Sequence, residues 1–250
     1  MTHRNFSGSP VCGRRELLLA LVSAAWAILF GAAAQAAPPP KETGLAFEGL
    51  LKAKPGFQPR KPAPRPFISV PGFLSERQVD AIYARYREAF AQLLAAECSL
   101  RSASRAPADA ARYAQLRDKQ VSSGNSVLLH EFFFRNLTPR KISPSHYVMA
   151  NVHEHMGSFE SWREDFAACA RVAGTWALLV YDPYDDRWHN LPVSASDAAG
   201  WVGSNPLVVC AVDPQAYALD YKNRDEYVAA FFEHIDWNAV AQRYHIVDRH

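Results

Sequence analysis

The sequence predicts an α+β fold in which an N-terminal antiparallel helical hairpin is followed by an α/β domain with a small three-stranded antiparallel sheet. In the first half of the chain, apolar residues recur at helical spacing in two stretches that are joined by a modest loop. In the second half, three short strand patterns lie between two pairs of helical patterns. Helices that precede a small sheet and then cover it are the expected arrangement.

The chain of 250 residues opens with the pattern of an export signal. The pair Arg14 and Arg15 precedes an uncharged run over residues 17–34, and an Ala-Gln-Ala cleavage motif follows at 34–36. We therefore expect residues 1–36 to be a signal peptide and the mature protein to be periplasmic or secreted. The arginine pair resembles a twin-arginine signal. An uncleaved anchor is the alternative, because the run is nearly long enough to span a bilayer.

Cleavage removes three Arg and one Glu, which leaves 24 basic and 24 acidic residues from the 27 and 25 of the whole chain. This balance gives no reason to expect nucleic acid or a membrane surface as a partner of the mature protein. Its cysteines, Cys98, Cys169 and Cys210, are odd in number and contain no CxxC pair. We expect three buried thiols, with one disulfide as the alternative in an oxidising compartment.

Residues 37–72 are interpreted as a Pro-rich arm or linker. Eight prolines lie between residues 37 and 66. Such a composition is typical of an extended tether or of an arm that follows a surface, and not of a domain.

The helical-hairpin domain is expected over residues 73–140. Its first helix covers residues 75–98, where Ser75 and Gln78 form a predicted capping box and Arg85 lies on the outer face. One face carries the apolar residues at helical spacing. They are Val79, Ile82, Tyr83, Tyr86, Phe90, Leu93 and Leu94.

A loop is expected over residues 99–108 and a short helix over residues 109–119. The second long helix is predicted to begin after Ser123-Gly124-Asn125 and to cover residues 126–136. It ends before Pro139, which disfavours helical backbone in the residue that precedes it.

The α/β domain is expected over residues 141–250 and begins with two helices within 145–173, broken at Gly157-Ser158. The second helix is predicted to bury one face. That face carries Phe159, Trp162, Phe166 and Cys169.

Three strands are expected to follow, over residues 175–181, 187–193 and 207–212, and the turn 182–186 joins the first two as a hairpin. Two more helices close the chain. Asn223 is the predicted N-cap of the first, and Asp236 that of the last, which runs through Tyr244.

Residues 206–221 carry the sequence PLVVCAVDPQAYALDY, a buried strand followed by a tight polar turn. The end of such a strand is where a metalloenzyme places ligands. Here the positions are apolar or neutral: Ala211, Pro214 and Gln215.

The element order and four stretches resemble the iron/manganese superoxide dismutase family. The stretches are residues 74–94, 127–137 (VLLHEFFFRNL), 157–180 and 206–244. The resemblance implies the family fold, a homodimer, and one iron or manganese ion held by three His and one Asp, ligands that suit a redox metal.

Position by position, one of the four implied ligands remains. A ligand His is kept as His130, whereas the other ligand positions fall on Ile82, Ala211 and Gln215. The positions that surround the family's ligands have changed as well. They fall on Tyr86, Phe90 and Ser126.

One ligand of four leaves no credible site for a redox ion. We therefore expect no cofactor, and a pseudoenzyme that acts as a binding or structural module for an unknown protein or small molecule. The alternative is an active dismutase, converting superoxide to oxygen and hydrogen peroxide, with iron or manganese in a rebuilt site. The replacements Pro214, Gln215 and Ala218 also put the family homodimer in doubt.

Two further interpretations concern histidines. His130 is expected to be a core histidine held by one hydrogen bond. His153 and His155 are two residues apart and would lie on different sides of a helix, so we expect a solvated surface and not a metal cluster.

Overall fold

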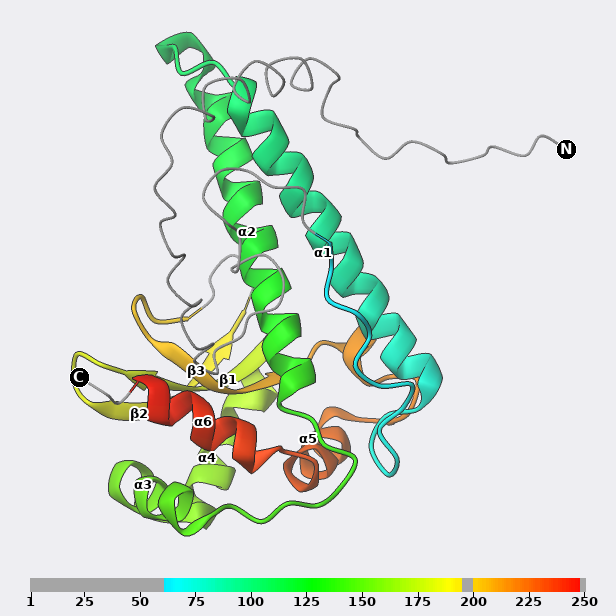
Figure 1. Cartoon of the computed structure of the whole chain (residues 1–250), viewed down its shortest axis with the longest axis vertical. Coiled ribbons are helices and arrows are strands. Elements are labelled where there is room, and N and C mark those ends of the chain that lie inside the picture. Colours follow the sequence, from blue (N-terminus) through cyan, green and yellow to red (C-terminus); the bar gives the residue numbers. More distant parts are fainter. Residues whose placement is uncertain (1–60, 195–199, 248–250) are drawn as a thin grey trace, which may run out of the picture. The chain divides into compact units, whose positions relative to one another are not determined.

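The computed structural model describes residues 61–194 and 200–247, which lie in one compact unit, Thr43–His250. Two long helices, α1 (Glu76–Ser102) and α2 (Ala110–Arg135), form an antiparallel pair, joined through the short helix η2 (Pro107–Asp109) (Figure 1). A three-stranded antiparallel sheet follows, with four further helices around it. This order confirms the predicted α+β fold. The predicted signal peptide, residues 1–36, lies outside the described residues.

Helix α1 begins where the sequence predicts, because the Ser75 side chain accepts a hydrogen bond from the Gln78 backbone N–H. The second half of the predicted capping box is wrong. The Gln78 side chain turns away from Ser75 and bonds the backbone of Gln215 and Leu219. The helix also runs to Ser102, four residues beyond the predicted end.

Helix α2 is continuous, and the predicted break at Ser123-Gly124-Asn125 is wrong. The expected short helix over residues 109–119 is its first part. A glycine inside a helix costs about 1 kcal/mol, but the pairing of two long helices outweighs that cost. At Gly124 the two helices lie close, since a Cβ there would meet Leu93 Cδ1 at 4.0 Å.

Helices α3 (His146–Met156) and α4 (Phe159–Val172) are separated at Gly157-Ser158, as predicted. Trp162 and Phe166 are fully buried on α4, whereas Cys169 is only partly buried because Ala170 takes the inward position beside it. Cys98 is also partly buried, and Cys210 is the one fully buried thiol of the three. The expectation of three buried thiols is therefore wrong for two of them.

The sheet consists of β1 (Trp176–Asp182), β2 (Arg187–Val193) and β3 (Asn205–Ala211) in the order β2-β1-β3. Every residue of the central strand β1 is buried. The hairpin between β1 and β2 confirms the predicted turn, and Ala211 pairs with Trp176 at the end of β3.

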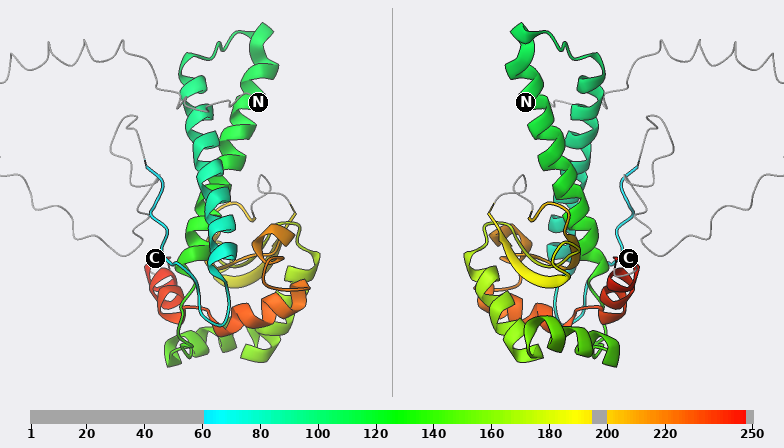
Figure 2. Two further views of the ribbon diagram at one scale, coloured as in Figure 1. Left: turned by 90° about the vertical axis from the view of Figure 1, so that its right-hand side faces the viewer. Right: turned by 90° about the vertical axis from the view of Figure 1, so that its left-hand side faces the viewer.

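After β3 come the short helix η3 (Pro214–Ala216), then α5 (Arg224–Glu233) and α6 (Trp237–Val247). Asn223 and Asp236 accept hydrogen bonds from the first-turn amides of α5 and α6, as predicted. Helix α4 packs on β1 and β2, and α2 and α6 pack on β3. The far half of the α1–α2 pair extends beyond the sheet (Figure 2). None of the described helices combines the length and apolar character needed to cross a bilayer.

The described part of the Pro-rich arm, from Lys61, lies along α1. The Ala63 backbone N–H donates to Tyr86 Oη (2.7 Å), and Tyr83 Oη donates to the Ala63 carbonyl (2.9 Å). Arg65 forms ion pairs with Glu76 and Asp80. In this part the arm therefore follows the surface of the fold.

Candidate functional site

His130 projects from the buried face of α2 and is 3% exposed. Its Nδ1 lies 2.7 Å from the Ser126 carbonyl oxygen. A carbonyl can only accept, so Nδ1 carries the proton and Nε2 keeps its lone pair. Burial, with a smaller contribution from the Arg85 charge, lowers the pKa of His130 to about 4. The ring is therefore neutral at pH 7, and it meets the Trp176 ring edge-on at a centroid distance of 4.9 Å.

Ile82 and Ala211 are 1% and 2% exposed and belong to the same apolar core as Trp176. Neither side chain has a lone pair to offer an ion. Gln215 lies at the exposed start of η3, where its backbone carbonyl accepts a hydrogen bond from Gln78 Nε2 (2.8 Å). Among the four positions, one imidazole nitrogen and one exposed amide oxygen are the available donors.

The structure brings Tyr86, Phe90 and Ser126 together with His130. The Tyr86 ring centroid lies 6.3 Å from His130 and 6.2 Å from Phe90. The Tyr86 hydroxyl donates to Glu131 Oε1 (2.8 Å). With the bond from the Ala63 N–H, this hydroxyl joins α1 to α2 and to the arm.

Arg85 is a site residue that the sequence analysis misplaced on the outer face of α1. Its guanidinium forms an ion pair with Asp213, whose side chain is 13% exposed. Arg85 lines a polar cavity of about 190 Å³ with His130 and Ser126, and also an apolar cavity of about 400 Å³ with Pro214 and Gln215. The Arg85 charge beside these two cavities is thus paired with a carboxylate of the fold. The charge of Asp213 was the one sequence feature that indicated a partner for Arg85. Because the two residues lie far apart in the sequence, the ion pair could not be predicted from it.

Glu131, which the sequence analysis did not single out, is a buried carboxyl, 5% exposed, beside His130. Burial raises its pKa, while the hydrogen bond from Tyr86 and the charge of Arg135 act in the opposite direction. Ionisation of the Glu131 carboxyl in the folded protein therefore costs folding free energy.

Glu131→Gln is expected to stabilise the protein at neutral pH and to lose this advantage in acid. A carboxyl with a raised folded-state pKa contributes stability below its unfolded pKa, and that contribution disappears as the pH rises through the folded pKa. The amide keeps an acceptor for Tyr86 without the buried charge. Unfolding free energies from urea titrations between about pH 4 and pH 8 should diverge as the pH rises. The exposed Glu164→Gln is the control. A constant gap between wild type and Glu131→Gln would contradict the prediction.

The prediction that His153 and His155 lie on a solvated surface is wrong for His155. Its ring stacks on Trp188 at a centroid distance of 5.4 Å, and Nε2 lies 3.3 Å from Tyr244 Oη. His153 is exposed, as predicted. The packing of α3 against β2 and α6 turns His155 inward.

The β1–β2 hairpin holds a cluster that could bind a metal ion. Asp182, Asp185 and His189 offer ligand atoms that all lie within 4.8 Å of one another. His189 Nε2 is already bonded to Asp185 Oδ2 (2.8 Å), and Asp182 Oδ1 accepts from the Tyr184 N–H (2.9 Å). These hydrogen bonds stabilise the hairpin turn, and they explain why the three side chains lie together without a metal ion.

The sequence of this chain is similar to those of known superoxide dismutases. A model of the C-terminal domain of iron/manganese superoxide dismutases matches residues 144–243. Superoxide dismutase [Mn] 2 of Haloferax volcanii is 36% identical over 124 residues, 49% of this chain and 62% of the relative. Superoxide dismutase [Fe] of Aquifex pyrophilus is 30% identical over 163 residues, 64% of this chain and 76% of the relative. The match thus spans less than two thirds of the Haloferax protein and about three quarters of the Aquifex protein.

Proposed function

Because this chain belongs to the iron/manganese superoxide dismutase family, we propose that it is an exported member that has lost dismutation of superoxide and acts as a binding or structural module. The observation that carries the proposal is the burial of Ile82 and Ala211, which occupy two positions where the family resemblance implies metal ligands. Ile82 and Ala211 are buried among apolar side chains. A rebuilt site would need donors where the structure has packed methyl groups.

The residues present do not fit an iron or manganese ion. His130 Nε2 and the Gln215 amide are two neutral donors, whereas such an ion is held by several imidazole or carboxylate groups. The Arg85 guanidinium lines the cavities beside both of them. Two neutral donors, one of them on an exposed side chain, fall short of the donor set that holds such an ion.

Export is part of the proposal and rests on the sequence of residues 1–36. The arginine pair, the uncharged run and the Ala-Gln-Ala motif form a signal peptide that directs the chain to the periplasm or outside the cell. The mature chain then has balanced charge, so we propose a protein or small-molecule partner and neither nucleic acid nor a membrane. The family homodimer is in doubt as part of the same proposal, because Pro214, Gln215 and Ala218 line an apolar cavity and do not supply charged groups.

Metal content tests the proposal. The chain is expressed with its own signal in cells supplied with both metals, and the exported form is purified without a histidine tag. Iron and manganese per chain are then measured by mass spectrometry. We expect near-zero values and no acceleration of superoxide decay. An iron superoxide dismutase purified by the same route is the control for metal supply. Close to one ion per chain, with activity, would establish the rebuilt dismutase instead.

The variant His130→Gln distinguishes the proposed module without a metal from a dismutase with a rebuilt metal site. If His130 is a core histidine, the variant loses stability, because the packing of the ring against Trp176 and the aligned Nδ1–H bond to the Ser126 carbonyl are lost, while metal content stays at the wild-type level. If His130 is a ligand, both metal and superoxide decay fall together. A loss of metal in this variant would overturn the proposal.

A further inference from the structure

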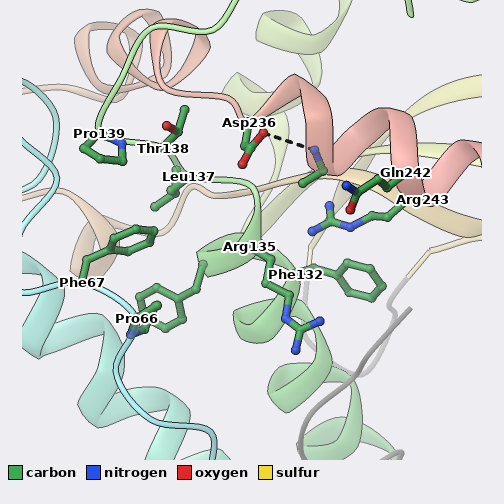
Figure 3. Close-up of a pocket in the computed structure, with 12 residues that line it drawn as sticks. Pro66, Phe67, Phe132, Arg135, Leu137, Thr138, Pro139, Asp236, Gln242 and Arg243 are labelled. Carbon is green, nitrogen blue, oxygen red and sulfur yellow. Dashed lines mark hydrogen bonds between the residues drawn. The ribbon is translucent and has the colours of Figure 1, made fainter. Parts of the chain in front are cut away.

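A cavity of about 440 Å³ opens where the end of α2, helix α6 and the arm meet. Its volume is in the range of small-molecule sites. Figure 3 shows Phe67 and Pro139 on one side and the side chains of Arg135, Gln242 and Arg243 on the other. The cavity therefore has an apolar side and a cationic side.

Arg243 is the cationic residue fixed most firmly by the fold. It is 6% exposed, Nη1 donates to the Leu207 carbonyl (2.8 Å), and its guanidinium carbon lies 4.9 Å from the centroid of the Phe132 ring. Burial, and next the charge of Arg135, lower its pKa to about 10, so it remains charged at pH 7. These contacts fix the position of the guanidinium, but neither of them is with a negatively charged group.

Among the described residues, no carboxylate is bonded directly to the cationic side of the cavity, and the charges of Glu131 and Asp236 act on Arg135 and Arg243 only at longer range. Within the described residues, neither Arg135 nor Arg243 forms an ion pair with a carboxylate. Asp236 is the acidic residue of the lining, and its Oδ1 accepts hydrogen bonds from Asn238 and Ala239 as the cap of α6. Two Arg and one Asp leave the lining with one net positive charge.

We propose that this cavity binds a small organic monoanion, a carboxylate attached to a compact apolar body. One carboxylate neutralises the net charge and matches the planar donor fork of a guanidinium. The apolar side, with Phe67 and Leu137, receives the body of the ligand. Burying an unpaired guanidinium is costly, and the anion relieves that cost. The cavity does not include Ile82, His130, Ala211 or Gln215, so the proposal holds whether or not the chain binds a metal.

Matched acid and amide probes test the proposal on the full exported chain. Calorimetric titration with 3-phenylpropionate and with hexanoate is compared with titration with their uncharged amides, which have nearly the same shape. At least one acid should bind, and its amide should bind ten or more times more weakly, because the amide lacks the charge that pairs with Arg135 and Arg243. Equal affinity of each acid and its amide, or no acid binding up to about 10 mM, would overturn the proposal.

Arg135→Gln places the binding in this cavity. Arg243 is unsuitable for substitution because it also holds the Leu207 carbonyl, whereas Arg135 has no such structural bond among the described residues. Arg135→Gln should weaken acid binding tenfold or more and leave amide binding unchanged. The exposed Arg140→Gln, close by in sequence but outside the lining, is the control. Equal weakening by both variants, or none by Arg135→Gln, would refute the assignment.

Discussion

Asn136→Ala is expected to lower the free energy of unfolding by about 2–4 kcal/mol, because it leaves the buried Val209 N–H without a partner and removes one of the two donors to the Leu207 carbonyl, the other being Arg243. Asn136 is fully buried at the end of α2. Its Nδ2 donates to the Leu207 carbonyl (3.2 Å), and its Oδ1 accepts from the Val209 N–H (2.9 Å). β3 lies at an edge of the three-stranded sheet. The amide therefore acts as the peptide group of a missing neighbouring strand.

The measurement is urea unfolding followed by tryptophan fluorescence. Asn151→Ala is the control, since the Asn151 side chain bonds a carbonyl one turn away within α3 and its loss should change stability by about 0.5 kcal/mol or less. A cost equal to that of Asn151→Ala would show that water replaces the side chain.

Local signals predicted most of the fold. The side chains of Ser75, Asn223 and Asp236 cap the helices at which they were predicted, because a cap depends on residues within one turn. The break at Ser123-Gly124-Asn125 was predicted from the same kind of signal and is wrong. The pairing of α1 with α2, a contact between distant parts of the chain, outweighs the local preference there.

The sequence predicted which residue types occupy the candidate site, but it did not predict which of those residues contact one another. The sequence alone shows that Ile82 and Ala211 are apolar residues at positions where the family resemblance implies ligands. It does not reveal that Arg85 turns back to Asp213, that Glu131 is buried against Tyr86, or that the arm supplies the amide of Ala63. Each of these contacts joins residues separated by 20 or more positions, for which the sequence offers no periodicity.

The side chain of Gln78 joins the segment after β3 to α1. It is fully buried; Nε2 donates to the Gln215 carbonyl (2.8 Å), and Oε1 accepts from the Leu219 N–H (3.0 Å). In this chain, an amide thus holds the turn at which the family resemblance implies metal ligands. The capping interpretation missed this role because it assigned the side chain to Ser75.

Gln78→Ala is expected to lower the free energy of unfolding by about 1–3 kcal/mol, less than Asn136→Ala, because Gln215 and Leu219 lie closer to solvent and their backbone groups can recover some bonds to water. Its larger effect is local. Amides of residues 213–221 should exchange with deuterium faster than in wild type, as mass spectrometry of peptides would show, while β1 keeps its protection.

Gln92→Ala, which removes a surface glutamine bonded to Glu88 on the same helix, should change neither the free energy of unfolding nor the exchange of these amides. Uniform loss of protection across the sheet would mean that Gln78 supports the whole fold and not this turn, whereas unchanged exchange at 213–221 would mean that the packing of η3 against α1 holds the turn without the amide.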